Sequence, residues 1–112
     1  MDISFANDKL ERECCDSKVC RKRYGDERAK RLGRRLDDLR AAETLAVMRS
    51  LPGRCHELSA NLKGQLAIDL DGPYRLIFEP AHDPIPVDDN GRLVWSLVTA
   101  IRILRIEDYH NG

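Results

Sequence analysis

The sequence predicts an α+β fold in which N-terminal helices pack on one face of a small antiparallel sheet. Apolar residues recur at spacings of three and four over residues 26–40, which is the period of a helix. From Gln65 onward they alternate instead with the period of a strand. A chain of 112 residues suffices for one modest core, so we expect residues 1–112 to form a single domain.

The first half of the chain is expected to form one short strand followed by helices. Residues 3–6 fit the strand, and Asp8 stands three residues before Glu11, as in a capping box that begins a helix. The polar segment 15–25 fits either a loop or a second, basic helix. The clearest helix runs over residues 26–40, with one apolar stripe made by Ala29, Leu32, Leu36 and Leu39.

Apolar positions continue beyond this helix to Met48, before Leu51-Pro52-Gly53 ends the segment. Two antiparallel helices and one kinked helix fit this pattern equally well.

The second half is expected to form strands. Residues 65–70 and 74–79 alternate in polarity around the turn signal Asp71-Gly72-Pro73, which predicts a hairpin with one apolar face. Residues 80–92 form a loop with three prolines and mostly acidic charges. Residues 94–106 are rich in β-branched side chains and are expected to form a long central strand.

Charge is unevenly distributed, although the formal net charge is zero. Residues 1–64 carry 15 Lys and Arg against 11 Asp and Glu, whereas residues 65–112 carry 4 against 8. The segment from Lys18 to Arg35 is the most basic, and such a segment either binds a polyanion or is an ordinary solvated helix face. The candidate cations for binding a polyanion such as RNA are Arg28, Arg31, Arg35 and Lys63.

Composition excludes several classes of protein. No apolar run approaches the roughly 20 residues that span a bilayer, and the N-terminus lacks the pattern of a signal peptide, so we expect a cytoplasmic protein without a membrane partner. Cys14, Cys15, Cys20 and Cys55 do not match the spacing of common zinc sites and are expected to be reduced. We therefore expect no metal and no cofactor.

Three places carry residues suited to chemistry: the segment Arg54-Cys55-His56-Glu57, the strand residue Arg75, and the terminal segment Glu107-Asp108-Tyr109-His110. An antiparallel sheet can bring them together. Histidines transfer protons near neutral pH, and an arginine holds a phosphate through two parallel hydrogen bonds. RNA supplies its own nucleophile, the 2′-hydroxyl, so these groups suffice for a ribonuclease. The same residues also fit surface features and a strand salt bridge.

The stretches HELSANLKGQLAIDLDGPYRLIFEP and TAIRILRIEDYH resemble the plasmid-maintenance killer proteins of the HigB branch of the RelE superfamily. The resemblance covers residues 54–110, about half of the chain, and the N-terminal half agrees only in architecture. It implies a RelE-like microfold. It also implies ribosome-dependent cleavage of mRNA and neutralisation by a helix-turn-helix antitoxin of the HigA type.

The resemblance assigns roles by position. His56 matches the histidine that opens the family's loop before the hairpin, and Arg75 matches the arginine that stabilises phosphate charge. Tyr109 and His110 match the terminal catalytic pair. The family often reads His-x-Leu-Lys-Gly, but here Ser59 occupies the lysine position and Lys63 follows four residues later.

Three functions are consistent with these features. The first is a metal-independent endoribonuclease toxin that acts on mRNA in the ribosome and contacts ribosomal RNA. The second is a toxin like the ParE branch, which inhibits DNA gyrase without cutting; His56, Tyr109 and His110 favour the first, because a pure binder needs no proton-transfer groups. The third is a non-toxic module that only binds its antitoxin, which Ser59 favours.

Overall fold

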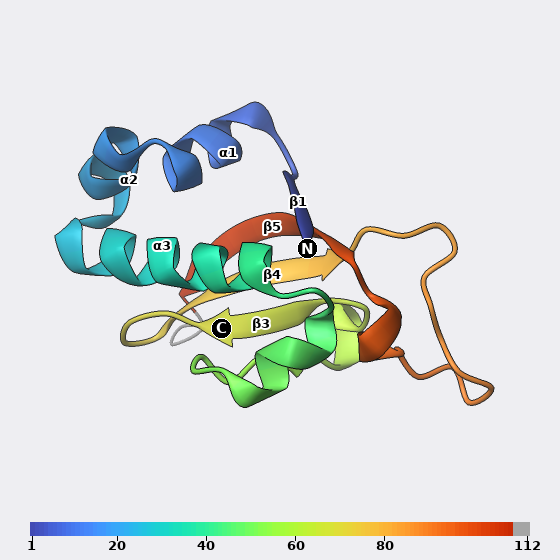
Figure 1. The fold of residues 1–112 in the computed structure, drawn as a ribbon. Coiled ribbons are helices and arrows are strands. Elements are labelled where there is room, and N and C mark those ends of the chain that lie inside the picture. The colour runs from blue at the N-terminus through green and yellow to red at the C-terminus, as the bar shows by residue number, and fades with distance from the viewer. Residues whose placement is uncertain (109–112) are drawn as a thin grey trace.

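The computed structural model describes residues 1–108, in which helices cover one face of a five-stranded sheet (Figure 1). In chain order the elements are β1 (Asp2–Phe5), α1 (Asp8–Cys15), α2 (Ser17–Tyr24), α3 (Asp26–Ala41), the 3₁₀ helix η1 (Leu45–Ser50), β2 (His56–Glu57), the 3₁₀ helix η2 (Ala60–Leu62), β3 (Leu66–Asp69), β4 (Tyr74–Pro80), the 3₁₀ helix η3 (Trp95–Leu97) and β5 (Ala100–Asp108). The predicted α+β class is confirmed.

The strands lie in the order β1-β5-β4-β3-β2. Strands β2 to β5 pair antiparallel as expected, but β1 runs parallel to β5, with Asp2 opposite Ala100, so the sheet is mixed. A parallel pair needs a long crossover connection, and here the whole of the remaining chain separates the two strands. The last strand, β5, is shorter than the predicted range 94–106, because residues 95–97 form η3 and β5 begins only at Ala100.

Helices α1 and α2 begin at side chains that cap them. The Asn7 side chain accepts a hydrogen bond from the Leu10 backbone N–H at 2.8 Å, so of the two candidate caps Asn7 and Asp8 it is Asn7 that caps α1. The Asp16 carboxylate accepts from two backbone N–H groups at the start of α2, which decides the open question for this segment in favour of a helix. After α3, the chain forms the short η1 instead of either a second α-helix or a kinked one.

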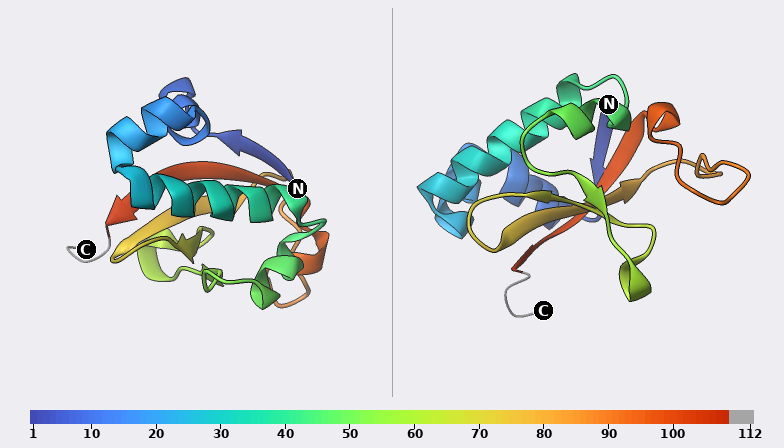
Figure 2. Two further views of the ribbon diagram at one scale, coloured as in Figure 1. Left: turned by 60° about the vertical axis from the view of Figure 1, so that its left-hand side comes forward. Right: turned by 90° about the horizontal axis from the view of Figure 1, so that it is seen from below.

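The core lies between α3 and the sheet (Figures 1 and 2). Leu32, Leu36 and Leu39 of the predicted α3 stripe are buried. They belong to one cluster with the apolar side chains of the hairpin and β5: Leu66, Ile68, Leu76, Phe78, Ile101 and Ile103. Each such side chain stabilises the fold by about 1.5–3 kcal/mol relative to exposure to water. Within residues 1–108, no helix has the length and apolarity that a bilayer crossing requires.

Gly53 brings the chain from η1 to the edge of the sheet. Its φ is +113°, and a Cβ there would lie 2.6 Å from Ile68 Cγ1 and 2.9 Å from Arg35 Nε. Its carbonyl accepts a hydrogen bond from the Asp69 backbone N–H at 2.7 Å. Only glycine fits this position, which fixes where the following residues Arg54 to His56 lie.

Candidate functional site

The sheet face that the helices leave uncovered carries the polar side chains. Arg75 of β4 is in register with Glu107 of β5 and with Asp69 of β3. Residues in register share one face, and their neighbours Leu76 and Ile68 point into the helical core. Arg75, Glu107 and Asp69 therefore lie on the opposite face, which we call the open face.

Glu107 joins two arginines on the open face. Its Oε2 accepts from Arg75 Nη2 at 3.3 Å, and its Oε1 accepts from Arg105 Nε at 3.4 Å. Arg105 Nη2 also donates to Gln65 Oε1 at 3.0 Å. The Arg75 side chain is only 17% exposed, so its charge is partly shielded from solvent. Two guanidinium groups around one carboxylate leave a net positive charge that suits a phosphate.

A β-bulge places Arg105 and Glu107 on this face. Ile101 and Ile103 point into the core, so simple alternation would send residue 105 there as well. The register shifts after Phe78, which pairs with Ile103, whereas Ile77 pairs with Arg105. Leu104 is the extra residue of the bulge. After it, the side chains of β5 that face the core stand at even-numbered instead of odd-numbered positions, as Ile106 does.

His56 lies at the edge of the same face. His56 is opposite Ala67 of β3, and Ala67 is opposite Ile77 of β4. Ile77 is in turn opposite Arg105 of β5, so His56 and Arg105 belong to one row across the sheet. Its Nδ1 lies 2.7 Å from the Arg54 carbonyl oxygen. A carbonyl can only accept, so Nδ1 carries the proton, and a neutral ring then has its lone pair on Nε2. His56 can thus accept a proton at Nε2.

The structure brings some predicted residues together and separates others. His56 and Arg75 share the open face, but two strand spacings and two residues along the strand put their Cα atoms ~12 Å apart. They can act on one substrate only if it lies between them. Tyr109 and His110 lie outside the described residues, which end at Asp108 opposite Tyr74.

Two of the predicted RNA-binding arginines have structural roles. Arg35 is 6% exposed and its Nε donates to the Asp69 carbonyl oxygen at 3.1 Å, so the expectation that it faces water is wrong. Burial lowers the pKa of its guanidinium. Arg28 stacks on Tyr74, 3.3 Å from the ring centroid, and its Nε bonds Asp71 at 3.0 Å.

The other predicted cations stay accessible. Arg31 is half-buried on α3, and Lys63 is exposed between η2 and β3. Arg34, which is not among the predicted RNA-binding residues, is exposed on α3. Sequence reasoning also missed Arg105 and Gln65 on the open face. The signal was the adjacent pair Ile103-Leu104, where the alternation in β5 changes phase. Within residues 1–108, no group of His, Cys, Asp and Glu is arranged to hold a metal ion.

Solved structures share this arrangement of elements. A YoeB/ParE toxin from Agrobacterium tumefaciens superposes with a TM-score of 0.57 at 8% identity, over 97% of this chain and 99% of that one. YoeB from Staphylococcus aureus, solved as a complex with YefM and also as a dimer, superposes with a TM-score of 0.54 at 19% identity, over 96% of this chain and 94% of that one.

The chain has the fold of the RelE/YoeB-type toxins. No protein-family model matches its sequence, and no curated protein matches it. In this RelE/YoeB fold, the open face of the sheet is the surface on which Arg75, Glu107, Arg105 and His56 gather.

Proposed function

We propose that the protein is the toxin of a type II toxin–antitoxin system, of the HigB branch, and that it cleaves mRNA on the ribosome without a metal ion. The arrangement of Arg75, Glu107 and Arg105 on the open face supports this proposal most directly. It offers an oriented guanidinium fork to a phosphate, in a fold shared with YoeB toxins.

The reaction begins at the RNA 2′-hydroxyl. His56 Nε2 accepts the hydroxyl proton while the 2′-oxygen attacks the adjacent phosphorus. Arg75 stabilises the negative charge that builds on the phosphate oxygens, and Glu107 holds its guanidinium in place. His110 protonates the departing 5′-oxygen, and Tyr109 orients the nucleotide. The products are a 2′,3′-cyclic phosphate and a 5′-hydroxyl, so the protons balance without water.

The partners follow from the same proposal. YoeB from Staphylococcus aureus is solved as a complex with YefM, and we infer that this chain likewise has an antitoxin, a helix-turn-helix protein of the HigA type. Exposed cations on α2 and α3 contact ribosomal RNA through its phosphates. The protein acts in the cytoplasm, where ribosomes and mRNA meet.

A non-cutting protein is the second candidate. Ser59 occupies the position where the family often has lysine, and the Glu107 carboxylate already neutralises one guanidinium on the open face. Either feature weakens phosphate binding and fits a module that only binds an antitoxin. One of the similar structures is described as a YoeB/ParE toxin, so inhibition of gyrase is the third candidate.

Induced expression in a bacterial host, with mapping of new mRNA 5′ ends, separates these candidates. A nuclease toxin stops growth and creates 5′-hydroxyl ends within translated messages. Growth arrest with supercoiling defects and intact mRNA would favour gyrase inhibition. Normal growth with confirmed expression of folded protein would favour the antitoxin-binding module.

A further inference from the structure

Of the strands in residues 1–108, β2 is the shortest, and it carries His56. It consists of His56 and Glu57 alone and lies at the end of the strand order, with β3 as its one neighbour in the sheet. Its backbone pairs with β3 through His56 opposite Ala67 and Glu57 opposite Leu66. An edge strand this short has few ladder hydrogen bonds to hold it. The orientation of His56 therefore needs support from outside the sheet.

The Glu57 side chain supplies that support through a hydrogen bond from Trp95. Glu57 is opposite Leu66, which belongs to the core, so Glu57 lies on the helical side of the sheet and His56 on the open face. Trp95 Nε1 donates to Glu57 Oε2 at 3.0 Å. Hydrogen bonds to a carboxylate are stronger than those between neutral groups. Within residues 1–108, this is the one side-chain hydrogen bond that joins β2 to another element.

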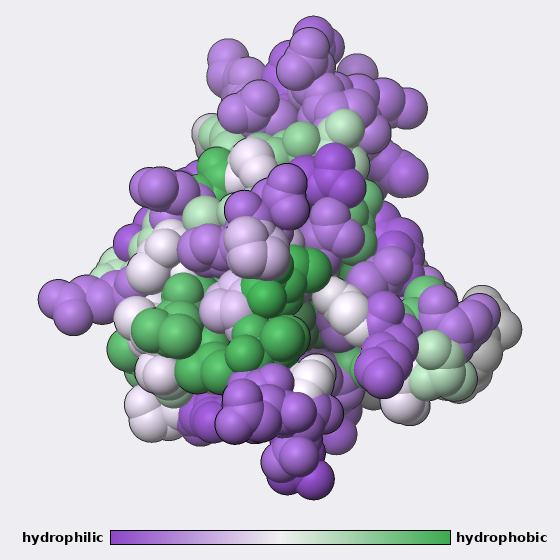
Figure 3. All heavy atoms as spheres, turned by 90° about the vertical axis from the view of Figure 1, so that its right-hand side faces the viewer, coloured by the Kyte–Doolittle hydropathy of each residue, from purple (hydrophilic) through white to green (hydrophobic). Residues whose placement is uncertain are grey.

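Trp95 is itself held in a fixed position. It is 5% exposed, whereas Leu97, two residues later in η3, is 60% exposed. The turn of η3 thus directs the indole into the core, and it does so on the side of the molecule where Figure 3 shows hydrophobic surface. The guanidinium carbon of Arg49 lies 4.0 Å from the centroid of the Trp95 ring, close enough for a cation–π contact. Both contacts restrict rotation of the indole and keep its N–H directed at Glu57.

We propose that Trp95 is a positioning residue for His56. Its hydrogen bond to Glu57 holds β2 from the helical side, so that His56 Nδ1 stays on the Arg54 carbonyl oxygen and the lone pair of Nε2 stays on the open face. The role of His56 as a base rests on the proposed function, whereas the control of its orientation does not. Trp95 acts through Glu57 and does not touch the substrate.

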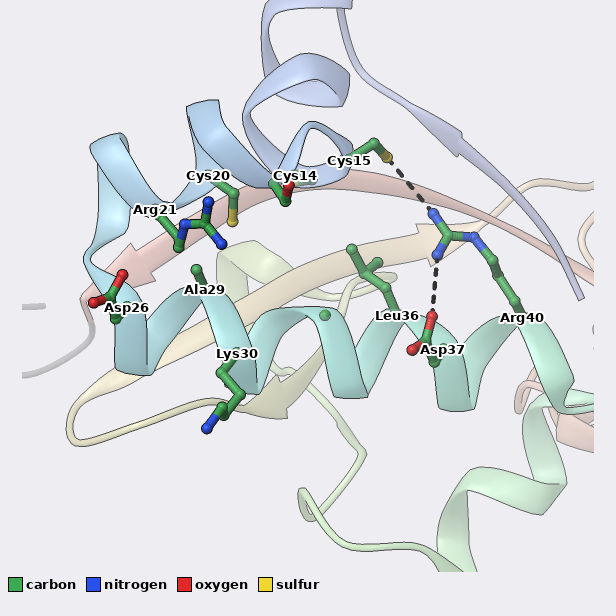
Figure 4. A pocket seen from close by; sticks show the side chains of 12 residues that line it. Cys14, Cys15, Cys20, Arg21, Asp26, Ala29, Lys30, Leu36, Asp37 and Arg40 are labelled. Carbon is green, nitrogen blue, oxygen red and sulfur yellow. Dashed lines mark hydrogen bonds and ion pairs between the residues drawn. The ribbon is translucent and has the colours of Figure 1, made fainter.

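Glu57 has room to turn away if the indole N–H is removed. Its side chain is exposed, and it lines a cavity of about 210 Å³ beside Leu66 and Pro80. The Trp95 donor therefore selects one position for a carboxylate that could otherwise turn to water. A larger cavity of about 810 Å³ cannot take over this role, because the described residues that line it all belong to α1, α2 and α3 (Figure 4).

Spectroscopy of the full chain without RNA tests the positioning. Trp95→Phe keeps an aromatic ring in the core but removes the N–H, and Glu57→Leu removes the acceptor. The nitrogen NMR spectrum of His56 should show the Nδ1–H tautomer in wild type and a mixture of both tautomers in each variant. Trp95 is the single tryptophan of the chain, so a change of its emission in Glu57→Leu reports the bond itself.

Hydrogen exchange provides a second measurement of the same effect. The backbone N–H of Leu58, directly after β2, donates to the Gln65 carbonyl oxygen at 2.9 Å. In Trp95→Phe and in Glu57→Leu it should exchange at least about tenfold faster, because β2 opens more often. The double variant should exchange no faster than either single variant, since both substitutions remove one and the same bond.

Two control variants separate positioning from general loss of stability. Val98→Ala shortens a fully buried side chain directly after η3 and leaves the Trp95–Glu57 bond intact. It should lower the melting temperature yet keep the wild-type spectrum of His56. Glu57→Gln retains an oxygen that accepts from the indole, so it should largely restore the Nδ1–H tautomer that Glu57→Leu loses.

Single-turnover cleavage on ribosomes connects the positioning with the reaction. Trp95→Phe should lower the rate at saturating ribosome concentration by about tenfold or more, because a displaced base slows the chemical step. The ribosome concentration at half-maximal rate should stay unchanged, because Trp95 makes no contact with the substrate.

A wild-type spectrum of His56 in both Trp95→Phe and Glu57→Leu would overturn the proposal. The same spectral change in Val98→Ala would also overturn it, as would a changed spectrum combined with an undiminished cleavage rate. If the wild-type protein does not cleave mRNA, the spectral change would still show that Trp95 holds His56, and only the nuclease function would be rejected.

Discussion

Nη2 of Arg75 lies 3.3 Å from Oε2 of Glu107, its cross-strand partner in the centre of the sheet. The carboxylate also holds Arg105 at 3.4 Å, so it fixes two guanidinium groups at once. A phosphate arriving on the open face would meet an arginine whose orientation is set before binding. Such preorganisation lowers the barrier of a step in which charge develops on the substrate.

Arg75→Ala should therefore lower the rate of mRNA cleavage by about a hundredfold or more, as does removal of one oxyanion donor, with little effect on ribosome affinity. Single-turnover cleavage on purified ribosomes measures the first, and sedimentation with ribosomes measures the second. Arg102→Ala is the matched control, because Arg102 pairs with Glu79 across the same two strands at 2.7 Å. If the affinity for ribosomes fell by the same factor as the cleavage rate, Arg75 would act in docking to the ribosome and not in the cleavage step.

His56→Asn should retain the fold and lose cleavage. The asparagine amide can still donate to the Arg54 carbonyl oxygen, but it offers no lone pair in place of Nε2. Loss of a general base costs about 10²–10⁴-fold in rate. Products of the wild-type reaction should carry a 2′,3′-cyclic phosphate and a 5′-hydroxyl. End-group analysis that finds a 5′-phosphate would mean attack by water, and the proposed role of His56 would be abandoned.

The half-buried Arg31 and the exposed Arg34 of α3 should govern ribosome association. Reversing Arg31 and Arg34 together to Glu should weaken binding and reduce the slope of log K against log salt by roughly one to two, since each phosphate contact contributes about one. Arg35→Met serves as the comparison, because it should lower thermal stability without changing this slope. An unchanged salt slope in the double reversal would identify the α3 surface as an ordinary solvated face.

Alkaline pH should destabilise the protein through its buried thiols. Burial raises the pKa of Cys14 and of Cys55 from 9.0 to about 12. The folded state thus keeps these protons while the unfolded state releases them. The stabilisation is fully present below pH 9 and is lost as pH rises toward 12.

The melting temperature, measured at intervals above pH 8, should fall, and Cys14→Ala should flatten that fall. A thiol reagent at neutral pH provides a second measurement, because Cys15 is exposed and should react first. Rapid reaction of all four thiols in the folded protein would contradict the burial of Cys14 and Cys20 and the partial burial of Cys55.

Gly53→Ala should destabilise the fold by more than about 1 kcal/mol, because an L side chain is strained at this positive φ. Its Cβ would also collide with Ile68 Cγ1 at 2.6 Å. Gly91→Ala is the matched control, with a positive φ of +78° but open space around the added carbon. Urea unfolding of both variants separates the cost of the collision from the cost of the positive φ. Equal losses in the free energy of unfolding would mean that the backbone relaxes around Gly53.

The sequence predicted those parts of the fold that depend on the local spacing of apolar residues. The α3 stripe and the alternation on either side of residues 71–73 needed no knowledge of distant partners. The parallel pairing of β1 with β5 joins opposite ends of the chain and has no local signal. Arg35 was misplaced because its charge suggested that it faces water, although it shares one helix face with the buried Leu32 and Leu39.

The candidate site could likewise be predicted only in part. His56 and Arg75 were found from their chemistry and from a resemblance, and the structure places them on one face. Arg105 could not be assigned from alternation alone, because the bulge at Leu104 reverses the face of every later residue in β5. A one-residue irregularity thus decides which side chains can reach a substrate.

The pairing of β5 with both β1 and β4 has a consequence for the order of synthesis. β5 is the last described strand to leave the ribosome, and the first strand has no partner in the sheet until it does. Glu107, which orients Arg75, emerges with it. Under the proposed function, a nascent chain would thus remain harmless to the ribosome that is making it. A message cut upstream of the codon for residue 100 would yield a polypeptide without β5, the strand between β1 and β4, so a nuclease of the proposed kind would limit its own production.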